Sequence, residues 1–90
     1  MGKLSKKIRI TEKNLSNIPN QSGTYILYRG NKSLYVGSAG AGRLQKRVKQ
    51  QVSIKRGISS VKYKPTSSEQ EARAWEKKYR DKYNPKQKNI

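Results

Sequence analysis

The fold is decided by the segment GTYILYR at residues 23–29, which is followed by GNK at residues 30–32 and by a second apolar run, LYVG, at residues 34–37. Both runs are rich in the β-branched and aromatic residues that favour strands, and the glycine and asparagine between them are typical of a turn. The sequence therefore predicts an antiparallel β-hairpin with strands near residues 23–29 and 33–37.

The length of the hairpin connection determines which side chains share a face of the sheet. With a two-residue loop, Tyr25 would pair with Val36, and Tyr25 and Tyr35 would lie on opposite faces. A three-residue loop over residues 30–32, or an equivalent bulge, instead pairs Tyr25 with Gly37. We predict this second register, which places the two tyrosines on one face.

Patterning predicts the remaining elements. Leu44, Val48 and Val52 recur at spacing four and indicate an amphipathic helix near residues 42–53. Alternating apolar and basic residues predict a third strand near residues 60–65, and a helix near 68–83 follows, with a shorter one near 11–17. At the start of the long helix, Glu71 stands three residues after Ser68, as in a capping box. The chain is therefore expected to be an α+β domain, with a three-stranded antiparallel sheet flanked by helices in the order β-β-α-β-α.

Composition narrows the functional classes. Ninety residues correspond to a single domain over residues 1–90, in which residues 1–14 read as a basic lead-in. Against 22 Lys and Arg there are only 5 Asp and Glu, and the net charge of +17 predicts a nucleic-acid partner. A ribosomal-type structural protein is the competing interpretation. No cysteine or histidine is present, which excludes thiol and imidazole chemistry, and no apolar run could span a membrane, so a cytoplasmic protein is expected.

One glutamate departs from the pattern of the last helix. Successive helical residues are about 100° apart, so the apolar stripe contains Ala72, Trp75, Tyr79 and Tyr83, and Glu76 falls inside it, about 40° from Ala72. A carboxylate in an apolar stripe needs a partner, because burying an unpaired charge is costly. The partner is either a lysine in a salt bridge or a divalent cation.

Two arginines are candidates for binding phosphate. Arg47 lies about 60° from Leu44 around its helix, so its stem can follow the core while the guanidinium reaches the hairpin. Arg43 is closer to the glycine-rich residues 37–42 and is a rival, and either could instead belong to a solvated basic face. The glycine-rich segment is not followed by Lys and Ser or Thr, so no nucleotide cofactor is expected.

Together these segments resemble the GIY-YIG nuclease family. Residues 23–25, Gly-Thr-Tyr, stand where that family has Gly-Ile-Tyr, and residues 35–37, Tyr-Val-Gly, stand where it has Tyr-Ile-Gly. Residues 15–19, 44–48 and 71–76, and then Pro85 and Asn89, are similar to the rest of the family pattern. The resemblance covers roughly residues 15–90 and rests on several motifs in one order.

The resemblance implies a metal-dependent DNA endonuclease that hydrolyses phosphodiester bonds. The implied metal is Mg²⁺ or Mn²⁺, with Glu76 as its protein ligand. Asn89 comes four residues after Pro85, where three is common in the family, so Asn84 is an alternative to it. The implied catalytic residues are Tyr25, Tyr35, Arg47, Glu76 and Asn89.

The family chemistry also assigns roles to these residues. Arg47 would stabilise charge that develops on the phosphoryl oxygens while water attacks. Tyr25 is the favoured base with Tyr35 as its hydrogen-bonding partner. A neighbouring cation would favour tyrosinate, and it is a lysine, with Lys32 and Lys46 as candidates, Arg47 or the metal.

We expect DNA contacts at Gly37, Arg43 and Lys46. The alternative function is a catalytically silent nucleic-acid-binding module of the same fold, against which the retained Glu76 argues.

Overall fold

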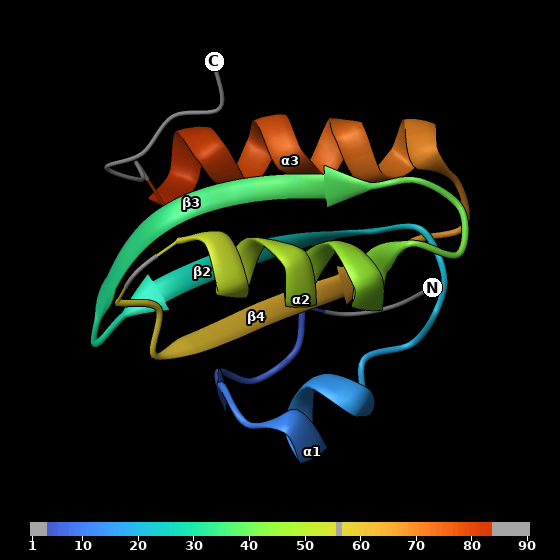
Figure 1. The fold of residues 1–90 in the computed structure, drawn as a ribbon. Helices are drawn as coiled ribbons and strands as arrows, with labels where there is room; N and C mark the ends of the chain where they lie inside the picture. Colours follow the sequence, from blue (N-terminus) through green and yellow to red (C-terminus); the bar gives the residue numbers. More distant parts are fainter. Residues whose placement is uncertain (1–3, 56, 84–90) are drawn as a thin grey trace.

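A four-stranded antiparallel sheet lies between helices in the computed structural model, which describes residues 4–55 and 57–83 (Figure 1). The strand order across the sheet is β1-β4-β2-β3, so β3 forms one edge. The helix α3 runs along β3 on one face, and α2 lies on the other. In chain order the elements are β1 (Ile8–Arg9), α1 (Glu12–Ser16), β2 (Gly23–Arg29), β3 (Lys32–Ala39), α2 (Leu44–Ile54), β4 (Ser60–Pro65) and α3 (Glu69–Tyr83).

The predicted hairpin register is confirmed, and a bulge produces it. At the tip Arg29 pairs with Lys32 across a two-residue turn, in which Gly30 has a φ of 59°, a conformation that glycine adopts readily. The register then shifts, because Tyr28 pairs with Ser33 while Leu27 pairs with Tyr35. The extra residue in β3 restores the predicted faces despite the short turn.

The prediction of three strands is wrong by one short strand, because the residues read as a basic lead-in also join the sheet. Ile8 pairs with Val61 and Arg9 with Ser60, which adds β1 to the free edge of β4. Ser5 extends this pairing, since its backbone N–H donates to the carbonyl of Tyr63 at 2.8 Å. The edge of β4 gains hydrogen-bond partners in this way, and the α+β class is unchanged.

The sheet separates two apolar clusters. On the α2 face, the first cluster includes residues of β2, β3, α1 and α2, and on the α3 face a smaller cluster joins both hairpin strands to α3. The members of the first are Leu15, Ile18, Tyr25, Leu27, Tyr35, Ala39, Leu44, Val48 and Val61. The members of the second are Ile26, Tyr28, Val36 and Tyr79.

Specific hydrogen bonds fix the position of α2. It begins at Leu44, two residues later than predicted, where the backbone N–H of Leu44 donates to the carbonyl of Gln21 at 3.0 Å. At the next residue, the Gln45 side-chain amide donates to the carbonyls of Ser16 and Ile18, both at 2.9 Å. These bonds join the start of α2 to the segment that precedes the hairpin.

The start of α3 is capped nearly as predicted. Ser68 Oγ accepts the backbone N–H of Glu71 at 3.1 Å, which is the expected half of a capping box. The Glu71 carboxylate bonds to the backbone N–H of Ser67 at 2.8 Å, one residue before the expected partner. Further along, the buried hydroxyl of Thr24 donates to the carbonyl of Ala72 at 2.7 Å and ties β2 to α3 one turn before Glu76.

Candidate active site

The two motif tyrosines lie side by side on the α2 face of the sheet. Their ring centroids are 6.1 Å apart, and the two hydroxyls are close enough to share a hydrogen bond. Both side chains are buried, Tyr25 with 1% and Tyr35 with 9% of its surface exposed. The prediction that both rings share a face is therefore confirmed.

Gly37 provides the space for these rings. A Cβ atom at this position would lie 2.5 Å from the Tyr25 hydroxyl oxygen and 2.8 Å from Cε2 of Tyr35, closer than atoms can approach. Gly37 is also buried, so it does not lie at the surface, where we expected it to contact DNA. The packing of the two tyrosine rings therefore explains why position 37 is a glycine.

The environment shifts both tyrosine pKa values. Burial raises the pKa of Tyr25, and its neighbour Tyr35 raises it further, while Arg47 acts in the opposite direction. Burial and then Glu76 raise the pKa of Tyr35, but the hydrogen bond with Tyr25 and the charge of Arg47 both lower it. Both pKa values are raised, and the surroundings of Tyr35 oppose ionisation less than those of Tyr25 do.

Arg47 lies on α2, half-buried, at a basic hollow. The hollow has a volume of about 330 Å³ and is lined by Arg43, Lys46, Arg47 and Gln50. Arg43 and Lys46 are exposed, and their contact with DNA stays a prediction. Arg47 differs from both because its charge also acts on the two tyrosines.

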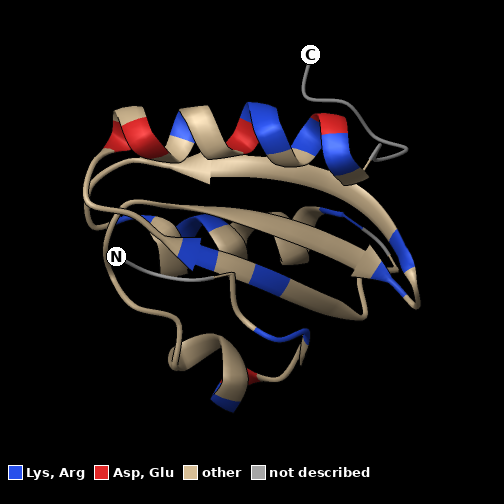
Figure 2. Cartoon of the chain, turned by 180° about the vertical axis from the view of Figure 1, so that it is seen from behind, with Lys and Arg blue, Asp and Glu red and all other residues tan. Residues whose placement is uncertain are grey.

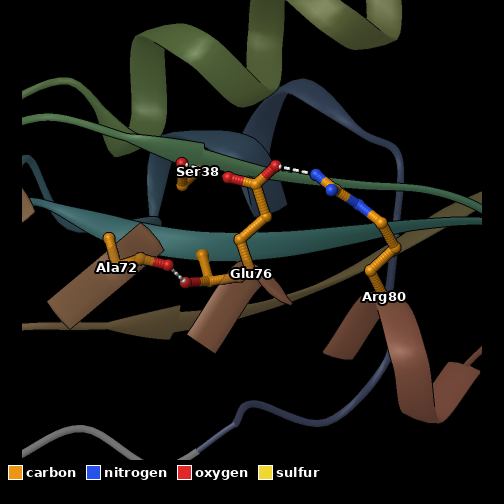
Figure 3. Close-up of polar contacts among 5 residues, drawn as sticks. Ser38, Ala72, Glu76 and Arg80 are labelled. Carbon is orange, nitrogen blue, oxygen red and sulfur yellow. Dashed lines mark hydrogen bonds and ion pairs between the residues drawn. The ribbon is translucent and has the colours of Figure 1, made fainter. Parts of the chain in front are cut away.

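Glu76 is 8% exposed and lies within the apolar stripe of α3, as its position in the helix predicted. Its Oε1 accepts a hydrogen bond of 2.5 Å from Ser38 Oγ, and its Oε2 forms an ion pair with Arg80 (Figure 3). The salt bridge considered from the sequence is therefore present, with an arginine one helical turn away in place of a lysine.

The candidate site is built across the edge of the sheet. Along β3, Tyr35 and Gly37 point to the α2 face, whereas Ser38 points to α3 and contacts Glu76. Because β3 is the edge strand among residues 4–55 and 57–83, no further strand of this part of the chain separates the two faces there. The charge of Glu76 accordingly raises the pKa of both Tyr25 and Tyr35, although it belongs to a helix on the opposite face.

The donor set at Glu76 fits a hard divalent cation with few protein ligands. Within residues 4–55 and 57–83, no group of three or more carboxylate, imidazole or thiol side chains comes together. Mg²⁺ is commonly held by one or two carboxylates and completes its shell with water and phosphate oxygens. Beside Glu76 an open hollow of about 580 Å³ has room for such ligands.

Sequence reasoning missed three side chains at the site. Arg80 stands four residues after Glu76, so an ion pair on one helix face was readable from the spacing. The Ser38 contact depends on how α3 packs on β3 and left no local signal. Lys55, not Lys32 or Lys46, lies over the Tyr35 ring, with its ammonium 4.3 Å from the centroid.

Charge is distributed unevenly over the surface. Apart from Glu12, every acidic residue lies on α3, whereas β4 carries only basic charges (Figure 2).

Among the described helices, none is long and apolar enough to cross a membrane. The expected Asn89 and its alternative Asn84 both lie outside the described residues.

No protein-family model matches the chain, and no curated protein matches it either. Among solved structures, it is similar to the GIY-YIG N-terminal endonuclease domain of UvrC from Thermotoga maritima, a point mutant bound to its catalytic divalent cation. The two superpose with a TM-score of 0.70 at 23% sequence identity, and the match covers 86% of this chain and 96% of that one. The resemblance predicted from the motifs is thus confirmed at the level of architecture, and this chain has the GIY-YIG fold.

Proposed function

We propose that this protein is a divalent-metal-dependent DNA endonuclease whose catalytic residues are Tyr25, Tyr35, Arg47 and Glu76, with Asn89 or Asn84 as a fifth. One observation carries the proposal: β3 holds Tyr35 beside Tyr25, with ring centroids 6.1 Å apart. Three residues further along the same strand, Ser38 bonds to the nearly buried Glu76 of α3. A buried glutamate, a phosphate-binding arginine and paired hydroxyls are the groups that metal-assisted phosphodiester hydrolysis uses.

Tyr35 is the better candidate for the base, which reverses the roles favoured by the sequence. The hydrogen bond between the two hydroxyls raises the pKa of Tyr25 and lowers that of Tyr35, so it favours a negative charge on Tyr35 Oη over one on Tyr25. The same contact gives Tyr25 the role of orienting Tyr35. Tyr35 would accept a proton from the attacking water, and the Arg47 guanidinium would both favour tyrosinate and stabilise the phosphoryl oxygens.

Glu76 would hold the divalent cation, Mg²⁺ or Mn²⁺. When bound, such a cation polarises the phosphoryl group and stabilises the leaving oxygen. The Ser38 hydroxyl, 2.5 Å from Oε1, fixes the rotation of the carboxylate. Further oxygen ligands would come from water and from the DNA itself.

DNA is the proposed partner because of the net charge of +17 and the basic hollow at Arg43, Lys46 and Arg47. The similar domain of UvrC is an endonuclease bound to its catalytic divalent cation, which supports the same class of reaction here. A cytoplasmic location stays a prediction.

A silent DNA-binding module is the second candidate, and one observation favours it. Both carboxylate oxygens of Glu76 already have protein partners, Ser38 and Arg80. A plasmid-nicking assay separates the two functions. The endonuclease converts supercoiled plasmid to the nicked form in Mg²⁺ and stops in excess chelator, and Tyr35→Phe and Arg47→Gln each abolish the reaction. Nicking that is absent in both Mg²⁺ and Mn²⁺, with DNA binding intact, would establish the silent module instead.

A further inference from the structure

The ion pair between Glu76 and Arg80 is incomplete. Arg80 uses Nη2 to contact Glu76 Oε2, but its Nε is buried and, within the described residues, has no hydrogen-bond acceptor. Leaving a buried donor unpaired costs about 1–3 kcal/mol. The guanidinium therefore has a donor that it could satisfy better in another position.

A second arginine on the same helix provides a comparison. Arg73 pairs with Glu69 at 2.7 Å, also one turn away, but its side chain is 71% exposed, as in an ordinary surface pair. The Arg80 side chain is 32% exposed, and its partner carboxylate is almost buried. Water can screen the charge of the exposed Glu69, so Glu69 does not need Arg73 to neutralise it. The nearly buried Glu76 is reached by less water, so its charge depends more on Arg80.

Arg80 also has a place to move. The hollow of about 580 Å³ beside Glu76 is lined by Ser38, Arg73, Glu76, Lys77, Arg80 and Asp81. Three of these side chains are cationic, and Asp81 is the only described carboxylate besides Glu76 on its lining. A phosphate group that entered the hollow would meet this cationic wall, and a guanidinium can donate two parallel bonds to it.

We propose that Arg80 is a displaceable counter-ion: it neutralises Glu76 until a divalent cation binds there, and then turns toward a DNA phosphate in the same hollow. This inference rests on the proposed function, because it assumes a divalent cation at Glu76. The arriving cation repels the guanidinium and takes over the neutralisation of the carboxylate. Arg80 thus competes with the metal in the absence of DNA and binds DNA once the metal is present.

The competition is tested by Mn²⁺ binding without DNA, measured from the electron paramagnetic resonance signal of free hydrated Mn²⁺. Arg80→Gln removes the competing charge and keeps a hydrogen-bond donor, so we expect Mn²⁺ to bind about three- to tenfold more tightly than to the parent. Arg73→Gln removes the same charge from the same helix and hollow, and should change the affinity less than about twofold because its partner is Glu69. Equal affinities for these two variants would overturn the inference.

Two further measurements separate this inference from the proposed function. Glu76→Gln should abolish the tight Mn²⁺ site, and a variant that still binds Mn²⁺ like the parent would overturn both proposals. In the unsubstituted protein, the NMR signal of Arg80 Nε–H should shift when Mg²⁺ is added, while that of Arg73 stays in place. If Mg²⁺ binds at Glu76 and the Arg80 signal does not move, only the counter-ion role fails.

Discussion

Tyr25 on β2 lies directly opposite Gly37 on β3, and its ring fills the space that a side chain at position 37 would need. This relationship depends on the bulge in β3, without which Tyr25 would face another residue. One missing Cβ atom therefore permits the contact between the Tyr25 and Tyr35 hydroxyls, on which the proposed proton transfer depends.

Gly37→Ala should disrupt the site more than the fold. The new methyl group forces both tyrosine rings to move, at a cost of about 1–3 kcal/mol in the free energy of unfolding, and nicking should fall at least about a hundredfold. Gly30→Ala is the control: it strains a residue with a φ of 59° but has no atom within 4 Å of the new group. It should lower stability by about 1 kcal/mol and leave nicking unchanged. Equal nicking by both variants would show that the tyrosine contact is dispensable.

Thr24→Val should weaken the attachment of α3 to the sheet. The substitution keeps the shape of the side chain and removes the bond from its hydroxyl to the carbonyl of Ala72. We expect the free energy of unfolding, measured by urea denaturation, to fall by about 0.5–1.5 kcal/mol. Thr24→Ser is the control for the hydroxyl, because it keeps the hydroxyl and loses only a buried methyl group. A stability equal to that of the parent in Thr24→Val would mean that the bond contributes nothing.

Local sequence patterns predicted the elements and the most informative acidic residue. Two β-favouring runs, apolar spacing of four and a proline at the end of a strand determined the order of the described elements after residue 22. Glu76 could be singled out because the period of a helix is fixed, so a carboxylate within an apolar stripe is visible without coordinates. The faces of the hairpin followed from requiring Tyr25 and Tyr35 to act together.

Contacts between elements that are distant in the chain could not be predicted from the sequence. The strand β1 has two residues, too few for any alternation to be detected, and its pairing partner is distant in the chain. Ser38 meets Glu76 because α3 packs on β3, and the roles of Tyr25 and Tyr35 depend on which hydroxyl donates to the other. Gly37 was expected to contact DNA because it begins the glycine-rich stretch before α2, and its burial depends on the tyrosine rings that cover it.

The buried tyrosines should make the fold sensitive to alkali. The pKa of Tyr25 is raised above its unfolded value of about 10, so its contribution to stability is complete below pH 10 and is lost as pH rises toward the folded pKa. Each pH unit in that window costs about 1.4 kcal/mol. Tyr25→Phe cannot ionise, so its urea midpoint should fall less than that of the parent between pH 9 and pH 11. Parallel decreases would contradict the raised pKa.

Binding to duplex DNA should weaken steeply with salt. Neutralising phosphates releases counterions, so a protein that contacts four or more phosphates should lose about a hundredfold in affinity between about 50 and about 200 mM salt. Arg43→Gln and Lys46→Gln should each reduce the slope of log affinity against log salt by about one. A fluorescence anisotropy titration that gives a flat salt dependence would contradict DNA binding through the basic hollow.

The metal-ligand role of Glu76 is the central claim, and metal-dependent nicking by Glu76→Gln tests it most directly. The amide keeps the size and hydrogen-bonding capacity of the side chain but removes the charge that a divalent ion needs. The fold should survive, DNA affinity should persist or rise because a negative charge near the phosphates is gone, and nicking in Mg²⁺ should largely disappear. Glu71→Gln, which alters only the cap of α3, should melt slightly earlier and nick like the parent. If Glu76→Gln nicks plasmid at the parent rate in Mg²⁺, the metal-ligand assignment is wrong.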